Sequence, residues 1–295
     1  MQKPSCLYVF QDGPRDGYDL DIEKGSAVRK VIAELIDWDC DLNTFYSEKN
    51  LGCGPGPAAA ISWFFESVEM GLIFEDDAVP HQDFFKYAEK LLYRYRDDLS
   101  VRAIGSMKIE GNKYGKGSYY FSKMNRNLCA WATWRRAWSD FNYTMKDITE
   151  KELIKALKKY RTGLREREYW CERLLEIKKD ALGGSSWDMQ FLMSIWLHND
   201  KGICPNVNLS TNIGFDSEGT HTLSSHHVAA NIKTEPILPI KHPESITINK
   251  QADFLYHRLY FEPGNYGWEG LKRLPYRINK RIKRLLSHQG PWLKK

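Results

Sequence analysis

The chain has 295 residues, of which 42% are hydrophobic and 27% charged, a composition typical of a globular protein that buries a large core. Its net charge of +5 is concentrated at one end, because residues 266–295 contain nine Lys or Arg and one Glu, which leaves about −3 for the rest of the chain. A slightly acidic body argues against nucleic acid as the partner.

The cysteines and the apolar runs exclude further classes of protein. The six cysteines show no CxxC spacing, which excludes the usual zinc-ligand pattern and a disulfide framework. No apolar run reaches the roughly 18 residues that a membrane span requires, and the first residues have no signal-peptide pattern. The sequence therefore predicts a reducing, cytoplasmic location.

Strands and helices alternate over the first hundred residues. Apolar runs that end in turn residues predict strands, and apolar residues at helical spacing predict helices. In chain order we expect a strand over 7–10, a helix over 26–38, a strand and a Gly/Pro-rich loop over 41–57, a helix over 58–70, a strand over 71–74, a helix over 81–98 and a strand over 101–107. This alternation predicts an α/β fold with a mainly parallel sheet flanked by helices.

The next part of the chain is expected to be helical. Residues 147–179 are highly charged and helix-prone, which is typical of one long helix or a helical pair. A Gly-rich loop follows at 183–186, and a helix is expected to begin near Trp187. A strand and a polar loop then follow over 203–222.

Acidic residues end two of the predicted strands. Asp12 follows the first strand, and the triplet Glu75-Asp76-Asp77 follows the strand over 71–74. In such sheets ligands bind at the carboxyl ends of the strands. Three like charges in a row repel one another, so they lie in water or around a cation, and Mn²⁺ or Mg²⁺ commonly joins carboxylates to substrate phosphates. The alternative is a solvated strand end with an Asp cap on the next helix.

Six motifs occur in the order and spacing of one family: VFQDGP, EKNLG, IFEDDAVPHQDFFKY, CAWATWRRAW, SSWDMQF and ICPNVNLSTNIGFDSEGTHT. Over roughly residues 7–222 the chain resembles bacterial nucleotide-diphospho-sugar transferases of the GT-A fold and, more distantly, N-acetylglucosaminyltransferase I. The resemblance implies a Rossmann-like GT-A sheet, dependence on Mn²⁺ or Mg²⁺, and a nucleoside-diphosphate sugar, with a UDP-sugar favoured, as the donor.

The resemblance also implies roles in the donor site. Asp12 would accept a hydrogen bond from the nucleobase, and the loop formed by Asn50, Leu51 and Gly52 would cover the nucleotide. Glu75 and Asp76 would face the ribose and nucleoside side of the donor. Asp77, the last of the triplet, would bind the metal directly.

Three further residues are assigned through the resemblance. Asp188 falls where the catalytic base lies in the relatives, with Trp187 beside it in the donor site, and His221 falls where several such enzymes supply a late metal or phosphate contact. Glycosyl transfer with inversion needs a carboxylate that deprotonates the acceptor hydroxyl, which agrees with a base at Asp188. The alternative is a structural Asp at a helix N-terminus, where a negative charge is favourable.

Tryptophans recur at spacings of three and four in Trp131, Trp134 and Trp138. On a helix they would form a buried stripe, which is the preferred interpretation of Trp134 and Trp138. Trp131 is the better candidate for a ring that faces the donor sugar.

The resemblance suggests how the chain is divided. We expect a transferase domain over 1–232, with a nucleotide-sugar half over 1–146, a helical insertion over 147–182 and an acceptor half over 183–232, followed by a C-terminal extension over 233–295. The relatives begin with one more strand and helix before the strand that ends at Asp12. That first βα unit is expected to be missing here, which would remove an internal strand of the sheet.

The expected function is transfer of a sugar to a hydroxyl of a bacterial surface glycan, with a glycan or lipid-linked acceptor. One alternative is a non-catalytic relative that binds a glycan or a membrane. A second is a metal-dependent nucleotidyltransferase, although the chain lacks the Gly-rich, Lys/Arg-containing phosphate loop expected near its N-terminus.

The C-terminal segment predicts a basic amphipathic helix after Pro275. Ile278, Ile282, Leu285 and Leu286 fall on one helical face, and Lys and Arg cover the rest. Such a helix can lie on an anionic membrane surface, which would place the protein at the inner face of the cytoplasmic membrane. The alternative is a helix that packs its apolar stripe on the domain.

Overall fold

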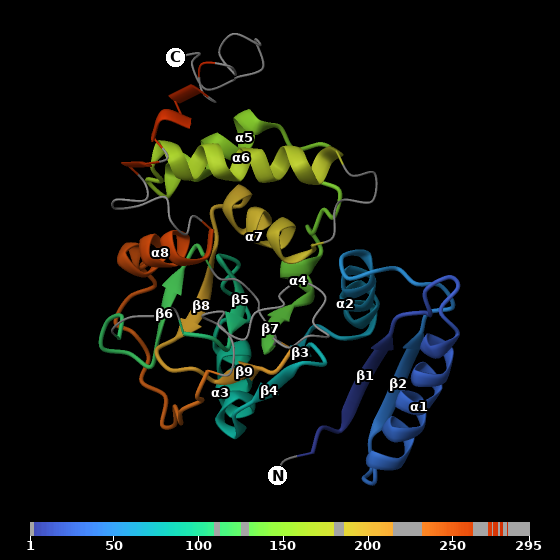
Figure 1. The fold of residues 1–295 in the computed structure, drawn as a ribbon. Helices are drawn as coiled ribbons and strands as arrows, with labels where there is room; N and C mark the ends of the chain where they lie inside the picture. Colours follow the sequence, from blue (N-terminus) through green and yellow to red (C-terminus); the bar gives the residue numbers. More distant parts are fainter. Residues whose placement is uncertain are drawn as a thin grey trace.

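The strands described for this chain form three sheets. The structure is a computed structural model that describes residues 3–108, 113–124, 130–179, 186–214 and 232–261, with further single positions between 271 and 282. Within them, two strands form a small parallel sheet, five form a central sheet and two form a short ribbon (Figure 1). The α/β class expected from the alternation of strands and helices is confirmed.

The first unit consists of β1 (Cys6–Gln11), α1 (Asp19–Leu35) and β2 (Asp41–Tyr46). β1 and β2 pair in parallel along their whole length. α1 begins earlier than the periodicity predicted, and it has no buried residue. Several of its apolar side chains are exposed, namely Leu20, Ile22, Val28, Val31 and Leu35. The unit therefore depends mainly on the contacts that its strands make.

α2 (Pro55–Ser67) joins this unit to the central sheet. The ring of Tyr8 in β1 lies 5.1 Å, between centroids, from the rings of both Trp63 and Phe64 in α2. Phe64 also covers Gly71 near the start of β3, where a Cβ atom would lie 2.3 Å from the Phe64 ring. A larger residue at position 71 would therefore push the helix away from the strand.

The central sheet has the strand order β3, β7, β5, β8 and β6. β7 is antiparallel to both of its neighbours, β6 is antiparallel to β8, and β5 and β8 pair in parallel. The sheet is therefore mixed rather than mainly parallel. Parallel neighbours need a long crossover, usually a helix, and no helix is described between β5 and β7. The bounds are Met70–Phe74 for β3, Val101–Gly105 for β5, Tyr119–Ser122 for β6, Ala130–Trp134 for β7 and Lys201–Pro205 for β8.

Helices cover both faces of the central sheet (Figure 1). One apolar core lies between the sheet and α5, α6, α7 and α8, and a second lies between the sheet and α3. The bounds are Gln82–Arg94 for α3, Arg135–Trp138 for α4, Glu150–Lys159 for α5, Leu164–Lys179 for α6, Asp188–Leu197 for α7 and Lys250–Tyr256 for α8, which continues as a π-helical turn over His257–Phe261.

The helical regions agree with part of the sequence analysis. Of the two alternatives for residues 147–179, the helical pair is the one that forms, as α5 and α6. Part of the expected C-terminal extension contributes to the first core through Ala252, Tyr256 and Phe261. Among the described residues, no helix has both the length and the apolar character that crossing a membrane demands.

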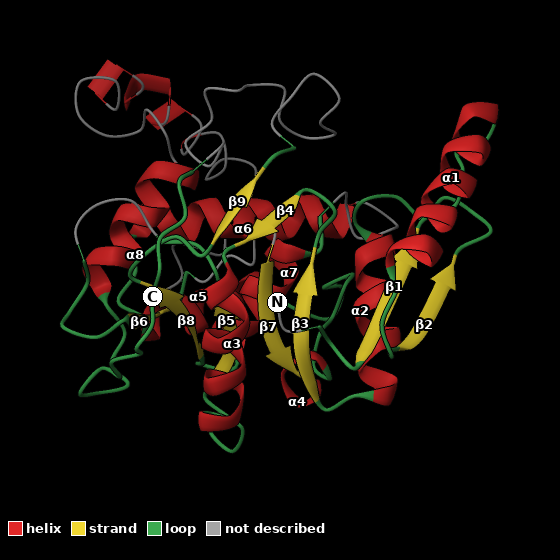
Figure 2. Cartoon of the chain, turned by 90° about the horizontal axis from the view of Figure 1, so that it is seen from below, coloured by secondary structure: helices red, strands yellow, loops and turns green. Residues whose placement is uncertain are grey.

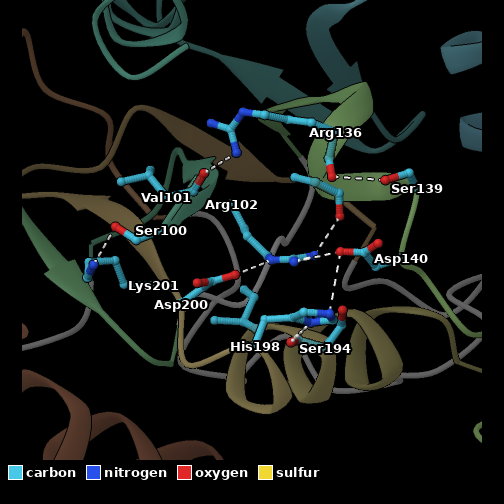
Figure 3. Close-up of polar contacts among 12 residues, drawn as sticks. Ser100, Val101, Arg102, Arg136, Ser139, Asp140, Ser194, His198, Asp200 and Lys201 are labelled. Atoms are coloured by element: carbon cyan, nitrogen blue, oxygen red, sulfur yellow. Dashed lines mark hydrogen bonds and ion pairs between the residues drawn. The ribbon is translucent and has the colours of Figure 1, made fainter. Parts of the chain in front are cut away.

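A buried arginine fixes the edge at which β5 and β8 begin (Figure 3). Arg102 donates hydrogen bonds from Nε to Asp200 at 2.5 Å, from Nη2 to Asp140 at 2.8 Å and from Nη1 to the carbonyl of Ala137 at 3.1 Å. Nε2 of His198 lies 3.4 Å from the same Asp140 carboxylate. A buried charge with this many partners is well satisfied, so the network positions strands. It lies at the amino ends of these strands, away from the edge where ligands bind in such sheets.

Candidate functional site

The acidic triplet forms a tight turn between β3 and β4 (Ala78–Pro80). The amide of Ala78 donates to the carbonyl of Glu75 across this turn, at 3.1 Å. Asp76 is exposed to solvent, whereas Glu75 and Asp77 are half-buried. The three carboxylates therefore differ in their exposure to solvent. The charge whose compensation has to be explained is chiefly that of the partly buried Asp77.

The two carboxylate oxygens of Asp77 differ in their hydrogen bonding. Its Oδ2 accepts a hydrogen bond of 2.8 Å from Nδ2 of Asn212. Its Oδ1 is buried and has no hydrogen-bond partner among the described residues. Burial raises the pKa of this carboxyl, the Asn212 hydrogen bond opposes the rise, and the charge of Asp76 adds to it. A buried oxygen in this state favours a ligand that brings a cation or a proton donor.

β9 (Ser210–Asn212) and the residues after it hold Asp77 in place. β9 pairs antiparallel with β4, and the amide of Ile213 donates to the carbonyl of Asp77 at 3.0 Å. Oδ1 of Asn212 accepts a hydrogen bond of 2.7 Å from the amide of Gly214, which orients the carboxamide. A Cβ atom at position 214 would lie only 2.5 Å from Oδ2 of Asp77, so the close approach depends on glycine.

Three asparagines at positions 206, 208 and 212 hold the segments that follow or precede several strands, and their contacts were not predicted from the sequence. Asn206 accepts from the amide of Tyr114 and Asn208 from the amide of Lys108, both at 2.8 Å, while Asn212 reaches Asp77. The signal that could have revealed them is the recurrence of Asn in the polar segment NVNLSTN, which follows β8. This segment therefore fixes the loops that surround the candidate site.

Asp12 organises a second loop, at the carboxyl ends of β1 and β2. Its Oδ1 accepts from the amides of Gly13 and Leu51, and its Oδ2 accepts from the amide of Gly52, each at 2.8 Å. Asn50 donates from Nδ2 to the carbonyl of Gly13 at 2.9 Å. Gly52 has a positive φ of 83°, a conformation that favours glycine. The structure thus brings together the residues predicted for the nucleotide loop, and Asp12 holds that loop through the backbone amides of Leu51 and Gly52.

Asp188 is the first residue of α7, and Trp187 occupies the N-cap position without a side-chain capping bond. The hydroxyl of Ser186 donates a hydrogen bond to Oδ1 of Asp188, and Nε2 of Gln190 donates to the carbonyl of Ser186 at 2.6 Å. A carboxylate in the first turn interacts favourably with the helix dipole, as the structural alternative requires. The Ser186 hydrogen bond also orients one carboxylate oxygen of Asp188. Neither interaction tests whether Asp188 acts as a base, so that role stays a prediction.

Trp131 and Trp187 lie in the core and do not line an open site. Their exposed fractions are 0% and 5%, and their rings stack at a centroid distance of 5.6 Å. Neither ring has a face open to a sugar in this structure, so the donor-facing positions expected for both are not supported. The reason is that β7 alternates: Trp131 faces the core with Phe191, and Trp134 faces the core on the other side of the sheet. Trp134 and Trp138 are buried as expected, although they lie on a strand and on α4 rather than on one helix.

A divalent cation fits the acidic turn as a site with few protein ligands. Among the described residues, no group of three or more His, Cys, Asp or Glu side chains could hold a metal ion. Mg²⁺ does not need such a cage, because it commonly binds one or two carboxylates together with water and substrate phosphates. Asp77, whose Oδ1 has no partner in the described part of the chain, and the exposed Asp76 beside it are a donor set of that kind. His221, the other expected ligand, lies outside the described residues.

No protein-family model matches the chain, and no curated protein is significantly similar to it. Functional conclusions therefore depend on the geometry of the acidic turn and on the motifs of the sequence.

Proposed function

We propose that this chain is a metal-dependent glycosyltransferase of the GT-A type. It transfers a sugar from a nucleoside diphosphate, with a UDP-sugar favoured, to a hydroxyl of a glycan or lipid-linked acceptor in bacterial surface-glycan synthesis. The observation that carries the proposal is Oδ1 of Asp77, which is buried at the carboxyl end of β3 and has no hydrogen-bond partner among the residues that the structure describes. The Asp12 loop, at the carboxyl ends of β1 and β2, supports it as a second polar element of the donor site.

The residues of the chain have distinct roles in this proposal. Asp77, fixed by Asn212, and Asp76 would hold Mn²⁺ or Mg²⁺, and the bound ion would supply positive charge beside the departing diphosphate. Asp12 keeps the loop over 50–52 in the conformation that receives the nucleoside, and Glu75 lies beside the metal carboxylates on the ribose side. Asp188 takes the proton from the acceptor hydroxyl, and attack from the face opposite the leaving group inverts the sugar.

A non-catalytic protein with the same fold is the second candidate. The burial of Trp131 and Trp187 favours it, because two aromatic rings that were expected to contact the donor are part of the core. Such a protein would bind a glycan or a membrane without transferring sugar. A nucleotidyltransferase is disfavoured by the absence of a Gly-rich, cationic phosphate loop near Asp12 in the sequence.

The deciding experiment incubates the protein with a panel of nucleotide sugars and Mn²⁺ and measures release of the nucleoside diphosphate. We expect slow release from one donor, and loss of that release in excess EDTA. Release that persists in EDTA would remove the metal from the mechanism. Binding of a glycan with no release from any donor would favour the non-catalytic protein.

A further inference from the structure

The last described helical positions, between 271 and 282, expose a stripe of large apolar side chains. Leu271, Leu274, Ile278 and Ile282 are 59%, 39%, 49% and 47% exposed. Their spacing of three, four and four residues puts them on one face of a helix. A helix that packs on the body would bury such a stripe. The exposure therefore argues against the packed alternative that the sequence had left open.

The sequence around this stripe is strongly basic. From residue 271 to residue 295 the chain has nine Lys or Arg and no Asp or Glu. Lys272, one of the described cations of this segment, is exposed. A partner for this surface must therefore accept apolar side chains and carry negative charge at the same time.

These two requirements separate the classes of partner. A second copy of this segment would bring like charges together, which opposes association. Nucleic acid would neutralise the cations but would leave the apolar stripe in water. The interface of an anionic lipid bilayer satisfies both requirements, because acyl chains receive the apolar face and headgroups receive the cations.

We infer that the segment 271–282, together with the cations that follow it, holds the protein on the surface of an anionic lipid bilayer. The apolar stripe enters the boundary between headgroups and acyl chains, and the excess of positive charge in this part of the sequence attracts the anionic headgroups. Tyr276, which is 70% exposed, has the amphipathic ring that suits this boundary. The inference stands apart from the acidic turn and does not rest on the proposed transferase activity.

The position of the segment is compatible with a site that faces the membrane. Figure 2 shows β1 and β3 pointing toward the side of the molecule on which the helical turns of 271–282 lie. The carboxyl ends of these strands carry Asp12 and the acidic turn. A protein held by this segment would therefore have its candidate site toward the bilayer rather than away from it.

The test is co-sedimentation of the full chain with vesicles of phosphatidylcholine alone or of phosphatidylcholine with phosphatidylserine. We expect binding to the vesicles that contain phosphatidylserine, little binding to neutral vesicles, and release as salt screens the headgroups. Ile278→Glu should weaken binding about tenfold or more, because it removes a large apolar side chain from the boundary. Replacing Lys280 and Arg281 together by Gln should weaken binding and reduce its salt dependence.

Leu99→Glu is the matched control, because Leu99 is 70% exposed and lies before β5, remote in sequence from the stripe. It makes the same chemical change and should bind like the unaltered chain. Ile278 and Leu99 are exposed, so thermal melting monitored by circular dichroism should be unaffected in Ile278→Glu and Leu99→Glu. The inference is overturned if the full chain ignores phosphatidylserine, if Ile278→Glu binds as well as Leu99→Glu, or if single-stranded RNA displaces the protein from the vesicles.

Discussion

Asn212 donates a hydrogen bond of 2.8 Å to Oδ2 of Asp77, and this contact joins residues that are 135 positions apart in the chain. It satisfies one oxygen of the carboxylate and leaves the other, Oδ1, buried without a partner among the described residues. The carboxylate is therefore oriented before any ligand arrives. Such preorganisation is what a metal or phosphate site requires, because less ordering remains to be done on binding.

Asp77→Asn should abolish turnover while the fold survives. The amide has nearly the same shape, but it lacks the charge that a divalent cation requires, and we expect the rate to fall by about 10²-fold or more. Mn²⁺ titration calorimetry in the presence of the nucleoside diphosphate should show the corresponding loss of affinity. Asp97→Asn is the control, because Asp97 is an exposed carboxylate with 86% of its side chain accessible. Equal activity in the two variants would contradict a metal role for Asp77.

Gly214→Ala should disturb Asp77 without changing its chemistry. The new Cβ atom would lie 2.5 Å from Oδ2 of Asp77, so the carboxylate or the loop has to move. We expect a loss of about 1–3 kcal/mol in the free energy of unfolding, together with weaker Mn²⁺ binding. Gly163→Ala is the matched control, since no atom lies within 4 Å of its added Cβ and its φ is not positive. If both variants bind Mn²⁺ like the unaltered chain, the close packing around Asp77 does not control the site.

Asp188→Asn tests the proposed base. Loss of a general base typically lowers the rate by about 10²–10⁴-fold, and the affinity for the donor should barely change. Ser186→Ala removes the hydroxyl that donates to Asp188 and should cause a smaller loss of rate, because the carboxylate remains. Steady-state kinetics and donor calorimetry on both variants measure these effects. A lower melting temperature with an intact rate in Asp188→Asn would instead favour the structural role at the start of α7.

The buried carboxyl of Asp253 should make the stability of the folded protein depend on pH. Burial raises the pKa of this carboxyl to about 6, although the charge of Lys123 and the hydrogen bond from Ser122 oppose the rise. The unfolded chain ionises the group near its ordinary value of 3.8, so the folded state holds the proton more tightly. The stability that the protonated group contributes is present below about pH 4 and is lost as pH rises through about 6.

The measurement compares urea unfolding of the unaltered chain and of Asp253→Asn at pH 4.5 and pH 7.5. The free energy of unfolding of the unaltered chain should fall by about 1–3 kcal/mol relative to the variant between these values. Comparing the two chains removes the opposite contribution of His257, whose pKa is lowered to about 3 by burial, since both chains retain it. Parallel pH profiles in the two chains would show that Asp253 has no such shift.

Local features of the fold could be predicted from the sequence, and long-range ones could not. The strands β1, β2 and β3 and the helical character of residues 147–179 follow from apolar periodicity, which is a property of neighbouring residues, whereas the choice of a helical pair over one long helix did not. The position of the acidic triplet at a strand end follows for the same reason. The direction of β7 does not follow, because it depends on how the chain returns after β5 rather than on the pattern within either strand.

In the candidate site, too, some features could be predicted from the sequence and others could not. The loop over Asn50 and Gly52 was expected to form part of the same donor site as Asp12, and the structure joins them, because the Gly52 amide donates to Asp12 and the Asn50 side chain donates to the carbonyl of Gly13. The Asn212 contact to Asp77 was not foreseen, because nothing in a local pattern says which distant side chain a carboxylate will meet. Trp131 was expected to face the donor sugar, but it lies in the core, because residues 131 and 134 on a strand point to opposite faces of the sheet and both faces are covered.

The exposure of helix α1 affects which part of the molecule opens most readily by local unfolding. With no buried residue in α1 and a sheet of two strands beside it, the β1–α1–β2 unit has little tertiary burial to protect its amides. Hydrogen exchange through local opening should therefore be faster there than around Trp196, which is fully buried. The loop that Asp12 holds belongs to this weakly protected unit. A nucleotide that binds this loop spends part of its interaction energy on ordering the unit, so its affinity and the exchange rates of α1 are thermodynamically linked.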